Sequence, residues 1–381
     1  MIRRITVFSA LALGTILGIG RADEPVKKDT RPQVEVVFCL DTTGSMGGLI
    51  DVAKAKIWAI SNQIAGGKPT PNLKIGLVAF RDRGDAYVTK IFPLTDDLDS
   101  IHGSLMGLRA AGGGDFPESV NQALYESVTK IKWSANKKTL KIIFLVGDAP
   151  PHMDYPDDVK YPETCKLAVK QDIIINSIQC GAHPQTKAEF EKICRLAEGS
   201  YVQIDSKGGP IITIATPFDA DLAKINTELA KSTLVYGDRM LRAEGKFKAA
   251  HAAGLAPAAA AERAGFAGKT GMAASYDLLD SIKSGKVKLE KLKKDELPEE
   301  LQKLAPKERQ AYLDKLDKRR QELLKKAANL DKQRGAFIAK KLAEQQKNRA
   351  MDSFDNQVLQ ILGRQARRVN IQYGVEEKKK N

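Results

Sequence analysis

Three short side chains that carry oxygen atoms alternate along one stretch of this 381-residue chain: Asp41, Thr43 and Ser45. They come directly after Val34–Leu40, an apolar, β-rich run that predicts a buried strand. In open α/β sheets, ligands bind beyond the carboxyl ends of the strands, where this loop would lie. Carboxylate and hydroxyl oxygens are the ligands that hard divalent cations such as Mg²⁺ prefer. The spacing therefore predicts part of a cation site.

Two further acidic loops could reach the same edge of a sheet. Asp148 follows another strongly apolar run, and Asp115 and Glu118 flank Pro117 after three glycines. Each element also has a purely structural interpretation, since Ser45 can cap a helix and acids beside a first-turn proline can offset the helix dipole. Carboxylates crowded together repel one another and raise one another's pKa values, and a divalent ion removes that conflict. The three loops together favour a real cation site over three separate turns.

The D-x-T-x-S loop at 41–45, together with Asp148, resembles the metal-ion-dependent adhesion site of von Willebrand factor type A domains, here in a bacterial, secreted type of protein. The segment 115–118 departs from the usual threonine loop and is similar to the D-x-P-E segment of integrin β-subunit domains. The resemblance implies a bound Mg²⁺, Mn²⁺ or Ca²⁺, completed by an Asp or Glu carboxylate of a partner protein. The implied ligands are Asp41, Thr43, Ser45, Glu118 and Asp148, with Asp115 as the second candidate from its loop.

The chain up to about residue 205 alternates between strand-like and helix-like segments. Near-continuous apolar strands indicate burial on both faces, as in a parallel sheet flanked by helices. The connection 81–85 is too short for a parallel crossover, so the strands beside it should pair antiparallel. We expect an α/β fold: a doubly wound, mostly parallel six-stranded sheet with one antiparallel edge strand, followed by an α-helical C-terminal region. The expected strands are Val34–Leu40, Lys74–Phe80, Val88–Leu94, Leu140–Val146, Ile173–Gln179 and Tyr201–Ile204.

Composition divides the chain into six segments. Arg3 and Arg4 precede a short apolar run that ends in Gly-Arg-Ala, the layout of a secretory signal peptide cleaved after about Ala22. We therefore expect a secreted, periplasmic or cell-envelope protein. The expected segments are a signal peptide (1–22), a linker (23–32), the von Willebrand type A domain (33–205), a helical extension packed on that domain (206–237), an Ala/Gly-rich linker (238–275) and a basic helical hairpin or bundle (276–381).

The positive charge of the chain is concentrated in its last segment. Lys and Arg outnumber Asp and Glu by 27 to 17 over residues 276–381, which accounts for most of the net charge of +14. This asymmetry suggests a tail that meets an anionic cell-envelope polymer or membrane surface. Nucleic acid is not expected as a partner, because few aromatic residues are interleaved with the basic ones. Leucines recur every seven residues in the tail, but Arg320 and Arg334 at the other seam positions are poor for a coiled coil.

Recognition, rather than catalysis, is the function that these features favour. We expect an exported adhesion or scaffold module that binds a partner protein through the metal, and no enzyme. One alternative is tethering to a polyanion or the envelope through the tail. A second is a serine hydrolase using Ser45, but the G-x-S-x-G elbow lacks its first glycine. The pairing of the four cysteines stays open, with Cys180–Cys194 the bridge that we expect if one forms.

Overall fold

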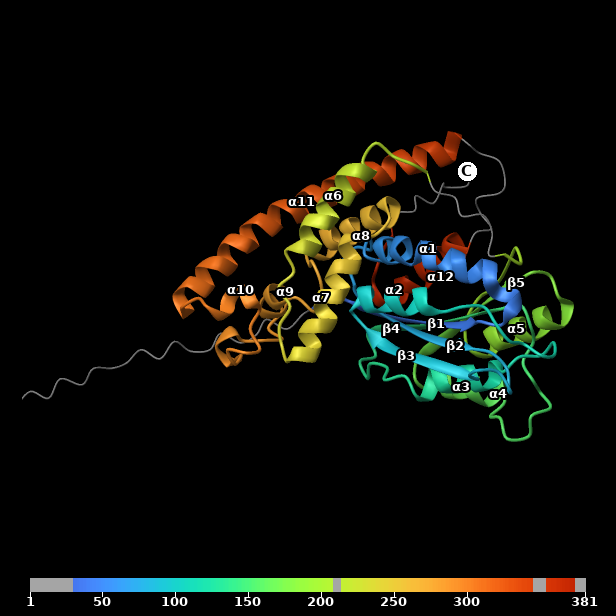
Figure 1. Cartoon of the computed structure of the whole chain (residues 1–381). Coiled ribbons are helices and arrows are strands. Elements are labelled where there is room, and N and C mark those ends of the chain that lie inside the picture. Colours follow the sequence, from blue (N-terminus) through green and yellow to red (C-terminus); the bar gives the residue numbers. More distant parts are fainter. Residues whose placement is uncertain (1–29, 208–213, 345–353, 374–381) are drawn as a thin grey trace, which may run out of the picture.

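The computed structural model describes residues 30–207, 214–344 and 354–373, and these residues contain a six-stranded sheet (Figure 1). The strand order is β3-β2-β1-β4-β5-β6, and every neighbouring pair is parallel except β2 with β3. This confirms the expected mostly parallel α/β sheet with one antiparallel edge strand. The strands are β1 Gln33–Asp41, β2 Asn72–Phe80, β3 Thr89–Thr95, β4 Thr139–Gly147, β5 Ile173–Cys180 and β6 Tyr201–Ile204.

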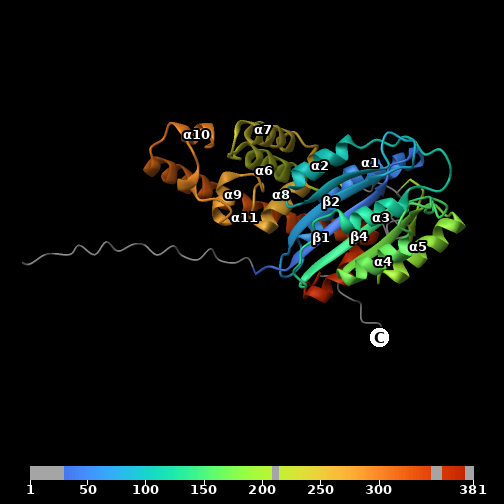
Figure 2. The same ribbon diagram turned by 90° about the horizontal axis from the view of Figure 1, so that it is seen from below.

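Helices cover both faces of the sheet (Figure 2). Alternate residues of β1 supply the two cores, with Phe38 and Leu40 in one hydrophobic cluster and Val37 and Cys39 in the other. The first cluster includes α1 (Gly47–Ile64), α2 (Leu98–Gly107) and α12 (Phe354–Gln365), and the second includes α3 (Val120–Thr129), α4 (Tyr161–Lys170) and α5 (Pro184–Leu196). Burial on both faces explains why the strands read as continuous apolar runs.

The segment expected to be an Ala/Gly-rich linker forms two helices, α7 (Arg239–Ala253) and α8 (Pro257–Thr270). Helix α8 packs against α1, α6 (Asp219–Lys231) and the long helix α11 (Pro306–Glu344). A Cβ atom on Gly268 would lie 2.6 Å from the backbone nitrogen of Ala328, so only glycine permits this approach of α8 to α11. The small residues of this segment therefore serve close helix packing, and composition alone did not show that.

The helical region beyond the sheet is fastened to it by a buried ion pair. Arg263 of α8 donates to both carboxylate oxygens of Asp99 on α2, at 2.8 and 2.6 Å. On α11, the buried face runs through Leu313, Arg320 and Ala327 rather than through the leucines that recur every seven residues. Arg320 is buried because it pairs with Asp277 at 2.7 Å, just before α9 (Leu278–Lys283). The basic seam positions thus belong to internal ion pairs.

We expected the tail to form a helical hairpin or bundle, but its last described α-helix, α12, does not pack with α11 in this way. It packs against α1, and its residues Phe354, Val358 and Ile361 complete the core on that face of the sheet. Figure 1 shows α12 beside α1 and apart from α10 (Glu299–Gln302). The reason is its apolar face, which the uncovered surface of α1 and β4 can bury.

All four cysteines are buried and free. The Cys180–Cys194 bridge is not formed, because Cys180 faces the core that contains α1, whereas Cys194 lies on α5 at the opposite face. The Sγ atom of Cys194 instead accepts a hydrogen bond from the Ser177 amide. The expected signal peptide lies outside the described residues. Among the described residues, no helix has the length and apolar character needed to cross a membrane.

Candidate metal centre

Asp41 is the last residue of β1, the strand between β2 and β4. Its side chain is buried, and Oδ1 accepts hydrogen bonds from the amide and the hydroxyl of Thr43, at 2.8 and 2.6 Å. The other oxygen, Oδ2, is buried and has no hydrogen-bond partner within the described part of the chain. Burial raises the pKa of Asp41 to about 7, and the carboxylate of Asp148 adds to the rise. A buried carboxylate oxygen without a partner is a position where an ion or an ordered water can bind.

Thr43 and Ser45 extend from the same loop, just before α1. The hydroxyl of Thr43 is 3.4 Å from the hydroxyl of Ser45. Thr43 is buried and Ser45 is exposed. Their two hydroxyl oxygens therefore lie between the buried carboxylate of Asp41 and the solvent. The backbone of Gly44 donates to the carbonyl of Gly112, which ties this loop to the glycine loop that precedes α3.

Glu118 brings a second buried carboxylate to the same place. Its Oε2 atom is also buried and unpartnered among the residues that the structure covers. A Cβ atom on Gly113 would lie 3.1 Å from both Glu118 Oε1 and Thr43 Cβ, so this glycine lies against both side chains. Burial is the main reason that the pKa of Glu118 rises to about 9, and the charges of Asp41 and Asp82 add to it. The two orphaned oxygens therefore belong to carboxylates that repel each other.

Asp148 completes the third loop, directly after β4. It is half-buried, and its charge raises the pKa values of both Asp41 and Glu118. A Cβ atom on Gly147 would lie 3.3 Å from Asp41 Oδ2, so the end of β4 passes close to the unpaired oxygen. The three loops that the sequence singled out thus meet at the carboxyl edge of the sheet.

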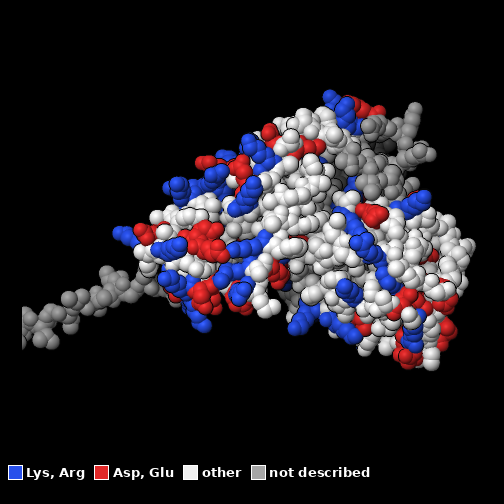
Figure 3. Space-filling model, in the orientation of Figure 1, with Lys and Arg blue, Asp and Glu red and all other residues white. Residues whose placement is uncertain are grey.

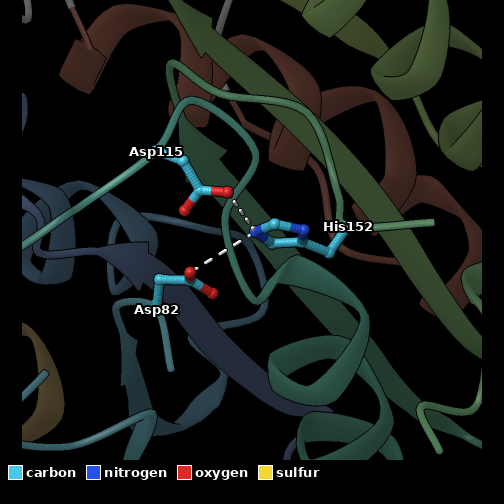
Figure 4. Close-up of side chains that lie close together, drawn as sticks. All are labelled: Asp82, Asp115 and His152. Atoms are coloured by element: carbon cyan, nitrogen blue, oxygen red, sulfur yellow. Dashed lines mark ion pairs between the residues drawn. The ribbon is translucent and has the colours of Figure 1, made fainter. Parts of the chain in front are cut away.

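Asp115, the second candidate from its loop, faces a different neighbour. Its side chain is exposed, and Oδ2 is 3.6 Å from Nε2 of His152 (Figure 4). Of the two acids in the D-x-P-E segment, only Glu118 is buried beside Thr43. The backbone explains why Glu118, and not Asp115, is buried there. The amide of Glu118 donates to the Pro150 carbonyl at 2.9 Å and so pairs this residue with the loop after β4.

Sequence reasoning missed two acids that shape the site, Asp82 and Asp85. Both follow β2, the neighbour of β1, in the connection that we interpreted only as a hairpin turn. Asp85 Oδ2 accepts from the amide of Gly113 at 2.9 Å and so holds the glycine loop. Asp82 is buried, but hydrogen bonds from Ser119 and Tyr155 keep its pKa below the usual value despite that burial. The signal was their position after the carboxyl end of a strand next to β1.

One family model matches the part of the chain that contains the sheet. Residues 35–215 match the family model of the von Willebrand factor A domain. The chain contains a von Willebrand factor A domain. Over 123 residues it is 37% identical to von Willebrand factor A domain-containing protein 7 of Mus musculus, which covers 32% of this chain and 13% of that protein. Over 204 residues it is 24% identical to a putative ariadne-like RING finger protein, R811, of Acanthamoeba polyphaga mimivirus, covering 49% of this chain and 20% of that protein. The chain thus spans a fifth or less of the length of these relatives.

Solved structures similar to the chain cover a little under half of it. Proximal thread matrix protein 1 from the mussel byssus has a TM-score of 0.37 and 16% identity, over 46% of this chain and 42% of that one. The SpRpn10 von Willebrand factor A domain has a TM-score of 0.36 and 15% identity, over 46% of this chain and 89% of that one. A further structure of the mussel protein, with a zinc-occupied adhesion motif, has a TM-score of 0.36 and 17% identity, over 45% of this chain and 42% of that one.

Proposed function

We propose that this von Willebrand factor A domain is a metal-dependent protein-binding module. The observation that carries the proposal is the pair of buried carboxylate oxygens, Asp41 Oδ2 and Glu118 Oε2, that have no hydrogen-bond partner in the described residues. Leaving such an oxygen unpaired costs about 1–3 kcal/mol, and more when the group is charged. Two of them at one sheet edge are best explained as cation ligands. The residues that would hold the ion are Asp41, Thr43, Ser45, Glu118 and Asp148.

The chemistry of this set selects a hard ion. All of its members offer oxygen, which suits Mg²⁺, Mn²⁺ or Ca²⁺ rather than a metal that favours sulfur. When bound, the ion supplies a positive centre that a carboxylate of a partner protein can complete. Without it, the charges of Asp41, Glu118 and Asp148 would repel that same carboxylate. Binding of the partner should therefore depend on the metal, because the bound ion gives the partner's carboxylate a positive centre to contact.

The solvent side of the site fits a protein partner. Ser45 is exposed, and so are Asp115 and Phe116 of the neighbouring loop. The side chain of Phe116 is 44% exposed and contacts the ring of His183, with centroids 4.1 Å apart. An exposed aromatic residue beside a charged site is a typical anchor of protein interfaces. We propose that Phe116 contributes to binding the partner.

Hydrolysis by Ser45 has less support. Its hydroxyl is near Thr43, and within the described ranges no hydrogen bond joins it to a histidine. Polyanion binding through residues 276–381 remains a second proposal. Arg320 and Arg334 of this segment are buried in ion pairs with acids, and Figure 3 shows both signs of charge mixed over the helical region. Export, the role of residues 1–22, also remains a proposal.

Two measurements on the full chain test the main proposal. In isothermal titration of EDTA-treated protein, Mg²⁺ should bind the wild type, and Asp41→Asn should weaken that binding by at least about 100-fold. The matched control is Asp51→Asn, an exposed aspartate on α1, which should titrate as the wild type does. Immobilised wild-type chain should retain a partner protein in Mg²⁺ and release it in EDTA, and Asp41→Asn should retain none. Equal Mg²⁺ binding by the wild type and Asp41→Asn would refute the proposal.

A further inference from the structure

His152 lies beside the candidate metal centre but takes no part in it. The side chain is 2% exposed, although it belongs to the loop that follows β4. Its Nδ1 atom is 2.8 Å from Oδ1 of Asp154, and its Nε2 atom is buried without a hydrogen-bond partner among the described residues. Figure 4 shows this Nε2 atom directed between the carboxylates of Asp82 and Asp115. The distances are 3.4 Å to Asp82 Oδ2 and 3.6 Å to Asp115 Oδ2.

The surrounding residues fix the ring in this position. The amide of His152 donates to the Glu118 carbonyl at 3.1 Å, and the His152 carbonyl accepts from the side chain of Asn121 at 2.5 Å. The ring stacks on Tyr155, with centroids 3.9 Å apart, and the Tyr155 hydroxyl donates to Asp82 Oδ2 at 3.0 Å. Histidine and aspartate are thus held by packing and hydrogen bonds, as a pre-formed binding site requires.

The hydrogen bond to Asp154 determines which nitrogen of the His152 ring carries the proton. Asp154 is exposed, and its Oδ1 atom lies 2.8 Å from Nδ1, a distance at which the carboxylate accepts a hydrogen bond from the Nδ1 proton. With a neutral ring, Nε2 then presents a lone pair to two carboxylates, which is repulsive. A cation between the three groups removes the repulsion. Orientation of a ligating histidine by a carboxylate on its other nitrogen is the usual outer shell of protein metal sites.

We propose that Asp82, Asp115 and His152 form a second cation site, which binds a first-row transition metal such as Zn²⁺. The three ligand atoms lie within 4.8 Å of one another. Two ligands bonded to zinc at about 2.0–2.2 Å in tetrahedral geometry are about 3.3–3.6 Å apart, and the two distances from Nε2 to the carboxylate oxygens, 3.4 and 3.6 Å, lie in that range. An imidazole nitrogen among carboxylates favours Zn²⁺ over Mg²⁺, Mn²⁺ and Ca²⁺, which suit oxygen ligands.

A proton on Nε2 is the competing explanation. It would make His152 a cation, paired with both carboxylates. Hydrogen bonds between charged groups are normally about 2.7–2.9 Å long, and both distances here are longer than that. The spacing therefore fits shared coordination better than a direct ion pair. Asp115 is 62% exposed, so the proposed site is open to solvent on its side.

The second site does not depend on the proposed function of the first. Its side chains are different from those of Asp41, Thr43 and Ser45, and the two sites are connected through the backbone and charge of Glu118 and through Asp85, which accepts from the amides of Asp82 and Gly113. A metal that binds at His152 would fix the loop that carries Asp115 and Phe116. The second ion would then order the rim that a partner protein meets.

The test measures Zn²⁺ binding by the full chain in the Asp41→Asn background, with Mg²⁺ present in excess, by titration calorimetry and by metal analysis after dialysis. We expect one bound Zn²⁺, lost on adding His152→Asn or Asp115→Asn and weakened about 10–100-fold by Asp154→Asn. His183→Ala, which removes an exposed histidine nearby, should bind Zn²⁺ like the parent. Circular dichroism checks folding, and Asp115→Asn keeps the test valid if the buried His152→Asn variant does not fold.

Two results would overturn the proposal. One is the absence of bound Zn²⁺ in the parent, and the other is equal Zn²⁺ binding by the parent and Asp115→Asn. If Asp41→Asn retained its Mg²⁺ while the histidine variant lost Zn²⁺, the first site would fail and the second would stand.

Discussion

Replacing Asp41 by asparagine should stabilise the metal-free protein and abolish its response to Mg²⁺. The pKa of Asp41 rises from 3.8 to about 7 in the folded chain, chiefly through burial. A rise of this size corresponds to roughly 4 kcal/mol, which the folded state loses when the carboxyl ionises. Asparagine keeps an oxygen that can accept from the Thr43 amide, and it removes the charge. In EDTA at pH 8, we expect Asp41→Asn to be more stable than the wild type by at least about 2 kcal/mol.

The dependence on pH has a definite sign. Because the folded pKa of Asp41 lies above the unfolded value, the folded state binds the proton more tightly. With respect to this group, the wild type in EDTA should therefore be most stable below about pH 4 and should lose stability as the pH rises to about 7. Asp41→Asn should lack this loss. Mg²⁺ at 100 times its dissociation constant should raise the free energy of unfolding of the wild type by about 2.7 kcal/mol, and it should leave that of the variant unchanged.

Thermal unfolding followed by circular dichroism, with and without EDTA, measures both effects. A difference of 2 kcal/mol shifts the melting temperature of a domain of this size by about 4–8 °C. The wild type should melt below Asp41→Asn in EDTA, and Mg²⁺ should raise the wild type alone. Asp51→Asn should follow the wild type in both conditions, because its side chain is exposed. The reasoning fails if Asp41→Asn melts below the wild type in EDTA, or if Mg²⁺ raises both by the same amount.

Three further predictions concern the same structure. Glu118→Gln should raise the stability of the EDTA-treated chain and weaken its Mg²⁺ binding in calorimetry, because it removes the second buried carboxylate; unchanged Mg²⁺ affinity would exclude Glu118 as a ligand. Arg263→Met should lower the free energy of unfolding in urea by about 3–5 kcal/mol, because it leaves the buried carboxylate of Asp99 without its cationic partner. The control is Arg319→Met, which breaks an exposed pair with Glu228 and should cost less than about 1 kcal/mol. Similar losses in the two variants would show that the buried pair does not hold the helical region to the sheet. A reducing agent should leave the melting temperature unchanged, because the four cysteines are free, and a marked drop would reveal a disulfide.

The sheet and the meeting of its loops could be predicted from the sequence because strong local patterns specify them. The buried strands β1 and β4 are apolar at most positions, and an acid stands at the end of the first and directly after the second. Once strands are parallel, their carboxyl ends share an edge, so Asp41 at the end of β1 and Asp148 after β4 had to come close. Which acid of the 115–118 segment would turn inward could not be read in this way. That choice depends on the backbone pairing of Glu118 with Pro150 and Pro151.

The helical half was harder to predict because its contacts are distant in sequence. Gly268 looks like a linker residue until Ala328, sixty positions later, is packed against it. Arg320 looks like a solvated base until Asp277 is placed beside it. Phe354 begins a helix that the sequence assigned to the tail, and the structure shows that this helix packs on α1. Periodicity reports that a face is apolar, but it does not name the surface that will cover it.

Diffraction from crystals soaked in Mn²⁺ tests the central claim most directly, because anomalous scattering locates the ion without reference to its ligands. We predict a peak at the carboxyl edge of the sheet, within bonding distance of side-chain oxygens of the proposed ligands, Asp41, Thr43, Ser45, Glu118 and Asp148. Absence of a peak there in a well-soaked crystal, with Asp41 Oδ2 and Glu118 Oε2 hydrogen-bonded to protein groups instead, would contradict the account.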